Sequence, residues 1–158
     1  MAEFRGRRVV HEYTQTNDAP PEKVFPLLCP VREAEWVPGW RYQLVYSRSG
    51  LAEEGCVFTT PNDDGSVTTW MVTGYDPEEF HIAFSWVHPE VMAAEISIAL
   101  TPKSDHKTCA RIRYAYTGLS PAGNQKIESY DRTWFEQKML GWEAAINRYL
   151  AMGTRVDC

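Results

Sequence analysis

The stretch PAGNQKIESYDRTWFEQKMLGWEAAINRYLAM, residues 121–152, decides the fold that this sequence predicts. Its large apolar residues recur at spacings of three and four, the period of an α-helix. They are Ile127, Tyr130, Trp134, Phe135, Met139, Trp142, Ile146 and Tyr149. Ser120-Pro121 suits a helix start and Gly153 a helix stop. We therefore predict one continuous amphipathic helix over residues 121–152, roughly 45 Å long at about 1.5 Å per residue.

The charged residues of this segment mostly lie outside the apolar stripe. They include Glu128, Arg132, Glu136, Lys138 and Glu143. A surface helix places its polar residues on the face opposite the core. We therefore expect these side chains to form the solvent face of the long helix.

Seven β-prone segments precede this helix, and most follow one another at intervals near ten residues. They cover residues 7–16, 41–47, 56–60, 67–75, 80–87, 91–101 and 107–117. Turn signals separate them, the strongest being Asn62-Asp63-Asp64-Gly65. Apolar and polar residues alternate most clearly in the last three segments. Such spacing predicts an antiparallel meander with one buried face, which must pack against the long helix.

Two short helices are expected between the first and second strands. Asn17 or Asp18 can cap the first, and Pro20 and Pro21 suit its first turn. Cys29-Pro30 ends that helix, and a second one over residues 31–36 stops at Pro38-Gly39. The predicted fold class is therefore α+β, with a single domain over residues 1–158.

The composition of the chain limits the kinds of partner that we expect the protein to bind. The net charge of −5 and the absence of a basic face argue against nucleic-acid binding. No apolar stretch approaches the roughly 20 residues of a membrane span. The N-terminus lacks an apolar signal segment, so we expect a cytoplasmic protein. Cys29, Cys56, Cys109 and Cys158 are far apart in the sequence, and we expect free thiols.

The order of strand, two short helices, six strands and long helix resembles the START-like superfamily, also called SRPBCC. The stretches that carry the resemblance are APPEKVFPLL (19–28), EAEWVPGW (33–40) and GYDPEEFHIAF (74–84). The resemblance implies a helix-grip fold, in which a seven-stranded antiparallel sheet wraps around the C-terminal helix. It also implies a hydrophobic cavity between the two. The superfamily includes lipid carriers, receptors and aromatase/cyclases, so the fold does not choose a function.

Aromatic residues, 13% of the chain, are the best candidates for a ligand pocket. Such residues also dominate ordinary cores, and this alternative carries about equal weight. The predicted ligand-binding residues are Trp36, Trp40, Trp86, Ile96, Ile98, Tyr114, Tyr116, Tyr130 and Trp134. Glu33 and Glu35 are the only acids near the predicted mouth, but exposed helix acids are far commoner than catalytic ones, so no catalytic residue is assigned.

No metal and no cofactor is expected, because the four histidines and four cysteines show no ligand spacing. Three functions remain open. The leading hypothesis is the binding of a small hydrophobic ligand in an internal cavity. The first alternative is an enzyme of the polyketide cyclase/dehydratase type. The second is a protein-interaction module, with a possible homodimer.

Overall fold

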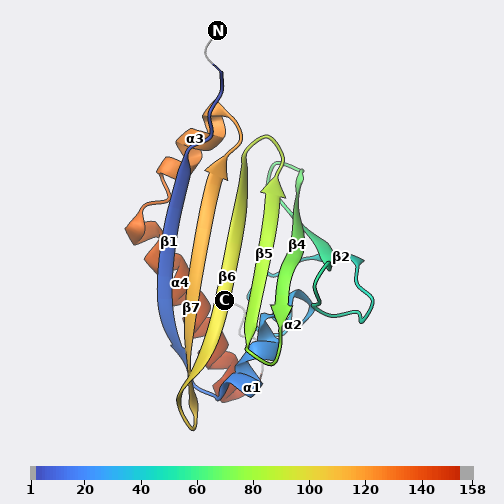
Figure 1. Ribbon diagram of the computed structural model, residues 1–158, viewed down its shortest axis with the longest axis vertical. Helices are drawn as coiled ribbons and strands as arrows, with labels where there is room; N and C mark the ends of the chain where they lie inside the picture. The colour runs from blue at the N-terminus through green and yellow to red at the C-terminus, as the bar shows by residue number, and fades with distance from the viewer. Residues whose placement is uncertain (1–2, 154–158) are drawn as a thin grey trace.

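A seven-stranded antiparallel sheet forms the body of the protein, in a computed structural model that describes residues 3–153. The strand order is β1-β7-β6-β5-β4-β3-β2, so the chain runs as a meander from β2 to β7 and β1 joins beside β7 (Figure 1). The strands are β1 (Arg8–Asn17), β2 (Gln43–Tyr46), β3 (Val57–Pro61), β4 (Val67–Asp76), β5 (His81–His88), β6 (Met92–Ser104) and β7 (Lys107–Gly118). The seven predicted strands are confirmed.

Three short helical segments connect β1 to β2. They are α1 (Pro21–Val24), the 3-10 helix η1 (Phe25–Leu28) and α2 (Pro30–Glu33). Each has a proline in its first two positions, where the missing N–H costs nothing. The predicted short helices after the first strand are therefore confirmed, although the first consists of α1 and η1, and α2 starts one residue earlier than expected and ends at Glu33.

The predicted continuous C-terminal helix is wrong, because the segment is broken into α3 (Pro121–Glu128) and α4 (Arg132–Met152). Asp131 starts the second helix, since its side chain accepts a hydrogen bond from Trp134 N at 2.8 Å. The sequence rule for N-caps explains this start. The predicted stop at Gly153 is confirmed, with φ of 72° in the left-handed region.

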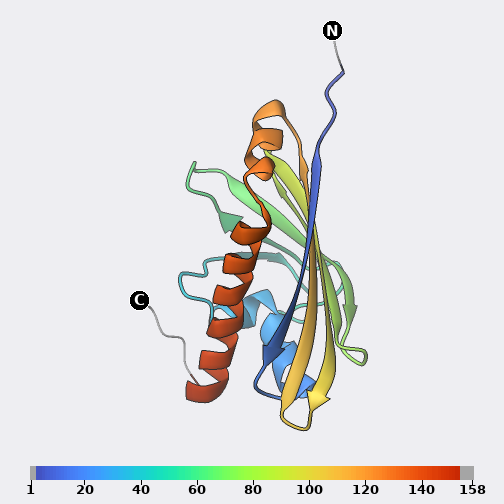
Figure 2. The ribbon, with the colours of Figure 1, turned by 90° about the vertical axis from the view of Figure 1, so that its left-hand side faces the viewer.

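The break between α3 and α4 ties the helices to the edge of the sheet. The backbone carbonyl of Tyr130 lies 2.6 Å from Nε2 of His11 on β1. The His11 ring also stacks on Phe135 with centroids 5.0 Å apart. Helix α4 then runs along one face of the sheet, against β1 (Figure 2). The break therefore fixes the position at which α4 crosses the sheet.

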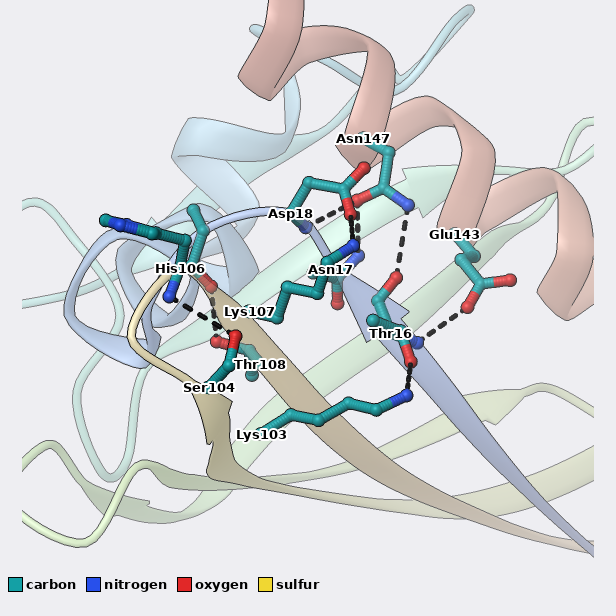
Figure 3. A network of polar contacts seen from close by, with 11 residues as sticks. Thr16, Asn17, Asp18, Lys103, Ser104, His106, Lys107, Thr108, Glu143 and Asn147 are labelled. Carbon is teal, nitrogen blue, oxygen red and sulfur yellow. Dashed lines mark hydrogen bonds and ion pairs between the residues drawn. The ribbon is translucent and has the colours of Figure 1, made fainter.

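A polar network holds the C-terminal half of α4 against β1 (Figure 3). The Glu143 carboxylate accepts from Thr16 N at 2.7 Å and from Tyr13 Oη at 3.2 Å. Asn147 accepts from Asp18 N at 3.0 Å and donates to the Thr16 carbonyl at 3.1 Å. Glu143 is therefore part of the helix–sheet contact and not of the expected solvent face.

The alternation of buried and exposed residues follows the prediction on β5, β6 and β7. On β6, for example, Ile96, Ile98 and Leu100 are buried while Glu95 is exposed. Strand β4 is different, because the register of its pairing with β5 shifts between Val72 and Gly74. Such a bulge moves later side chains to the other face, so a strict alternation could not be read from the sequence.

Three of the four cysteines belong to the described residues. Cys29 and Cys56 are buried and Cys109 is half-buried, and all three are free, as expected. Cys158 lies outside the described residues. Within residues 3–153, no helix is both long and apolar enough to cross a membrane.

Candidate functional site

An apolar cavity of about 230 Å³ lies between the sheet, α2 and α4. Five strands, α2, the turn that follows it and α4 all contribute walls to this cavity. Its lining consists of Pro30, Glu33, Val37, Trp40, Phe58, Trp70, Phe84, Ile96, Ile98, Tyr114, Lys138 and Trp142. For scale, a cavity of roughly 150 Å³ lined by aliphatic and aromatic side chains holds benzene. The volume therefore suits a ligand with a single ring.

The aromatic wall of the cavity is a connected set of rings. Phe58 and Trp70 stack with centroids 5.3 Å apart, and Phe84 meets Trp70 edge-on at 6.1 Å. The Trp40 indole donates a hydrogen bond to the Pro30 carbonyl at 2.8 Å, which ties Trp40 to the start of α2. Edge-to-face and offset contacts of this kind hold rings in defined orientations. The wall is therefore preformed.

Glu33 supplies one of two ionisable groups that face the cavity. It is the last residue of α2, it is half-buried, and it lines the cavity. Loss of hydration raises the pKa of the Glu33 carboxyl to about 8. Burial disfavours the charged form of a carboxyl, so Glu33 is mostly protonated at neutral pH.

Lys138 on α4 supplies the second ionisable group. Its Nζ lies 4.8 Å from the centroid of the Tyr114 ring and 5.4 Å from that of Trp134. It donates to the Tyr116 hydroxyl at 3.4 Å. The residue as a whole is exposed, but its Nζ lies close to the rings of Tyr114, Tyr116 and Trp134, which leave less room for water around the ammonium. This desolvation lowers the pKa of Lys138 to about 8.

Tyr114 connects the two groups. It lines the cavity from β7, under the Lys138 ammonium. Burial raises the pKa of the Tyr114 hydroxyl, and the nearby Glu33 carboxylate raises it further. The hydroxyl therefore stays protonated and can donate a hydrogen bond to a ligand.

Of the nine residues predicted to bind a ligand, four line this cavity: Trp40, Ile96, Ile98 and Tyr114. Two others, Trp86 and Tyr130, line a separate hollow described below. Trp36 is fully buried beside the cavity, where its indole donates to the Leu27 carbonyl at 2.8 Å. Tyr116 is also fully buried, and Trp134 stacks on Tyr130 with centroids 3.9 Å apart. These last three pack behind the walls.

Sequence reasoning missed the two most informative positions on α4. Trp142 was expected in the apolar stripe but not in the site. Lys138 was expected on the solvent face and is exposed, but it also borders the cavity. Trp134, Lys138 and Trp142 are spaced four apart, and residues at this spacing share one helix face. That spacing was the signal that could have placed the lysine beside the aromatic residues.

A second, larger hollow of about 410 Å³ lies near the β3–β4 hairpin. Its lining is Thr60, Asn62, Asp63, Asp64, Thr68, Trp70, Trp86, His88, Met92, Lys126 and Tyr130. The hollow is larger, but its walls are more polar and more open to solvent. Ligand sites bury most of their ligand among apolar groups. We therefore take the smaller cavity as the candidate site.

At the edge of this larger hollow, Asp64 and His88 of its lining contact Ser66, but not in the geometry of a catalytic triad. His88 Nε2 lies 3.2 Å from Ser66 Oγ and 3.3 Å from Asp64 Oδ2. A triad needs the serine and the carboxylate on different ring nitrogens. Asp64 also accepts from Ser66 N at 2.9 Å, and the Ser66 hydrogen bonds lower the pKa of Asp64 to about 2. The cluster stabilises the hairpin turn.

No group of three histidine, cysteine, aspartate or glutamate side chains within residues 3–153 is arranged to hold a metal ion. In the candidate cavity, the only carboxylate in the lining is that of Glu33, and the lining contains no histidine or cysteine. The groups available for chemistry in this cavity are therefore one carboxyl, one amine and one phenol.

Comparison with solved structures places this architecture among known proteins. Norcoclaurine synthase from Thalictrum flavum, in complex with dopamine and hydroxybenzaldehyde, superposes with a TM-score of 0.68 at 11% identity, over 92% of this chain and 88% of that one. The protein Ara h 8.0201 gives 0.61 at 14% identity, over 92% and 99%. DynU16, a putative protein of the dynemicin biosynthetic locus, gives 0.61 at 16% identity, over 92% and 48%.

These proteins share a seven-stranded sheet with a C-terminal helix and short helices after the first strand. The chain therefore has the same helix-grip fold as these solved structures, which is the fold that the resemblance predicted. No protein-family model and no curated protein matches the sequence. Sequence identities this low support a shared fold and not a shared function. The function therefore has to be argued from the cavity.

Proposed function

We propose that this protein binds a small aromatic or similarly compact apolar ligand in the cavity between the sheet and α4. The observation that carries the proposal is a cavity of about 230 Å³ walled by aromatic rings, with polar groups only at Glu33, Tyr114 and Lys138. Apolar walls with a few placed polar groups are typical of ligand sites. The volume favours a single ring over a lipid chain, because ligand pockets for larger molecules occupy roughly 300–1,000 Å³.

One structural neighbour supports this ligand class. The norcoclaurine synthase structure holds dopamine and hydroxybenzaldehyde, both compounds with one aromatic ring. That protein shares the fold and not the sequence, so its ligands support the size and character of the ligand and not its identity. A polar group on the ligand would meet the Tyr114 hydroxyl or the Lys138 ammonium, since both border the cavity.

Binding can be tested with benzyl alcohol and the intrinsic fluorescence of the tryptophans, three of which line the cavity. We expect a saturable change in emission. Val37→Phe adds a ring inside the cavity and should weaken binding roughly tenfold or more, since about 1.4 kcal/mol is tenfold in affinity. Val87→Phe makes the same change at an exposed position of β5 and should bind like the original protein. No saturable change, or equal binding by both variants, would refute the proposal.

A second candidate is acid–base catalysis of the cyclase/dehydratase type, favoured by the Glu33 carboxyl with its pKa near 8. An efficient general acid or base has a pKa close to the operating pH. The test is deuterium exchange at the carbon next to the carbonyl of phenylacetone, followed by NMR. Glu33→Gln should abolish the exchange. Glu35→Gln is the matched control, because Glu35 is exposed and hydrogen-bonded to Tyr149 outside the cavity.

A further inference from the structure

Lys138 stands apart from the other lysines by its surroundings. Lys107 pairs with Asp18 at 3.1 Å, and Lys103 donates to the Thr16 hydroxyl at 3.1 Å, both at the surface. Lys138 borders an apolar cavity, and its Nζ lies among aromatic rings. Within residues 3–153, no carboxylate lies within ion-pair distance of this Nζ. The amine is therefore accessible from the cavity and uncommitted to a carboxylate.

The aromatic surroundings affect the charge of this amine in two opposite ways. The ring faces of Tyr114 and Trp134 attract an ammonium ion. Loss of hydration around Nζ disfavours the same ion, and this desolvation lowers the pKa of Lys138 to about 8. A lysine of this kind carries an appreciable fraction of neutral amine near neutral pH. Desolvation in an apolar pocket is a recognised way to make a lysine nucleophilic.

Glu33 borders the same cavity from α2, on a different wall from Lys138. Because both side chains line the same cavity of about 230 Å³, a ligand in it can contact both of them. At neutral pH the Glu33 carboxyl is mostly protonated and can give a proton to a bound ligand. One cavity therefore presents a nucleophilic amine and a proton donor to the same molecule.

We propose that Lys138 forms a Schiff base with a small carbonyl compound, an aromatic aldehyde or ketone, bound in this cavity. This inference rests on the proposed function, because it uses the same site and adds the ligand's reactive group. The neutral Nζ forms a bond to the carbonyl carbon while the π electrons move to oxygen. A proton passes from nitrogen to that oxygen, which gives a carbinolamine.

The second half of the reaction uses Glu33. Its carboxylic acid protonates the carbinolamine hydroxyl, the carbon–oxygen bond breaks and water leaves. The nitrogen lone pair forms the carbon–nitrogen double bond, which gives an iminium ion. The Glu33 carboxylate takes the remaining proton from nitrogen when the neutral imine forms. The net change is amine plus carbonyl to imine plus water, and no oxidant or reductant is needed.

The test is reductive trapping of benzaldehyde with sodium cyanoborohydride near neutral pH, read by intact-protein and peptide mass spectrometry. We expect one benzyl group on the peptide that contains Lys138, formed roughly tenfold faster than on any other lysine. Lys138→Met and Lys138→Arg should lose this fast adduct. Lys126→Met, which removes the lysine of the other hollow, should keep it. Even labelling of all lysines, or fast labelling that survives in Lys138→Met, would overturn the proposal.

Two further measurements separate this inference from simple binding. Benzyl alcohol has the size of benzaldehyde but no carbonyl. If the original protein binds the alcohol and traps no aldehyde at Lys138, the Schiff base is refuted while the binding function stands. If neither compound binds, the proposed function fails as well. Glu33→Gln should lower the trapping rate at saturating aldehyde roughly tenfold, whereas a purely structural role would leave that maximal rate unchanged.

Discussion

The two faces of helix α4 differ in how far their polar side chains are paired. The face toward β1 is satisfied, because Glu143 and Asn147 bond to the backbone and side chains of the β1 end (Figure 3). The face toward the cavity is less fully paired, because Lys138 makes one long hydrogen bond to Tyr116 and has no carboxylate partner within residues 3–153. Both faces carry polar side chains from the same helix.

The difference indicates which polar groups hold the fold and which are available for chemistry. A buried polar group with its hydrogen bonds made contributes to stability, and leaving one without partners is costly. Groups with shifted pKa values in a cavity are candidates for function. Their burial lowers the stability of the fold where no structural contact offsets that loss. Substitutions on the two faces should therefore change stability in opposite directions.

The largest effect is expected at Asn147. Substitution by alanine removes the acceptor for Asp18 N and the donor to the Thr16 carbonyl. We expect a loss of about 2 kcal/mol in the free energy of unfolding, measured by urea denaturation, because two backbone groups lose their partners. Arg148→Ala changes the exposed neighbour and should stay within about 0.5 kcal/mol. An equal effect of the two substitutions would mean that the network does not hold α4.

The second effect, of opposite sign, is expected at Glu33, which faces the same cavity from α2. Its carboxyl has a pKa of about 8 in the folded state, well above the unfolded value. Between these two values the Glu33 carboxyl is ionised in the unfolded chain and protonated in the folded chain. The stability of the fold therefore falls as the pH rises from about 4.5 to about 8. Glu33→Gln should remove this slope and be more stable by about 1–2 kcal/mol at pH 8. Thermal melts at several pH values check this, with Glu35→Gln as the control.

A third prediction concerns the break between the helices. Asp131→Ala removes the side chain that accepts from Trp134 N, and loss of such a cap costs about 1 kcal/mol. The loss should appear as a lower melting temperature. A variant as stable as the original would show that the His11 contact with the Tyr130 carbonyl fixes the break alone.

Much of the fold could be read from the sequence, because alternation and turn signals are local properties. The strands around Ile96 and Tyr114 follow this pattern closely. The break at residues 129–131 was missed because Ile127, Tyr130 and Trp134 keep the helical spacing across it. Inside such a pattern, Asp131 looks like an exposed helical residue. Only the docking of the two helices on β1 shows that it starts a new helix.

The cavity itself was harder to predict, because it forms where side chains from segments far apart in the sequence leave space between them. Trp36 and Trp40 are four residues apart near the predicted mouth, yet one is buried behind the wall and the other lines the cavity. Glu33 was recognised as an acid near the mouth, but the burial that raises its pKa exists only in the folded protein. A lysine such as Lys138 has the same local sequence signal as a surface lysine.

The smallest effect on stability is expected at Lys138. The sign of this effect is the most direct test of the difference between the two faces of α4. The folded-state pKa of about 8 lies below the unfolded value of about 10.4, so the unfolded chain binds more protons between these values. The stability of the original protein should therefore rise from about pH 8 to about pH 10. Lys138→Met should be more stable at neutral pH, by less than about 1 kcal/mol because water reaches part of the side chain. This advantage should fade as the pH approaches 10. A clear loss of stability at neutral pH, of the size expected for Asn147→Ala, would mean that both faces of α4 serve the fold.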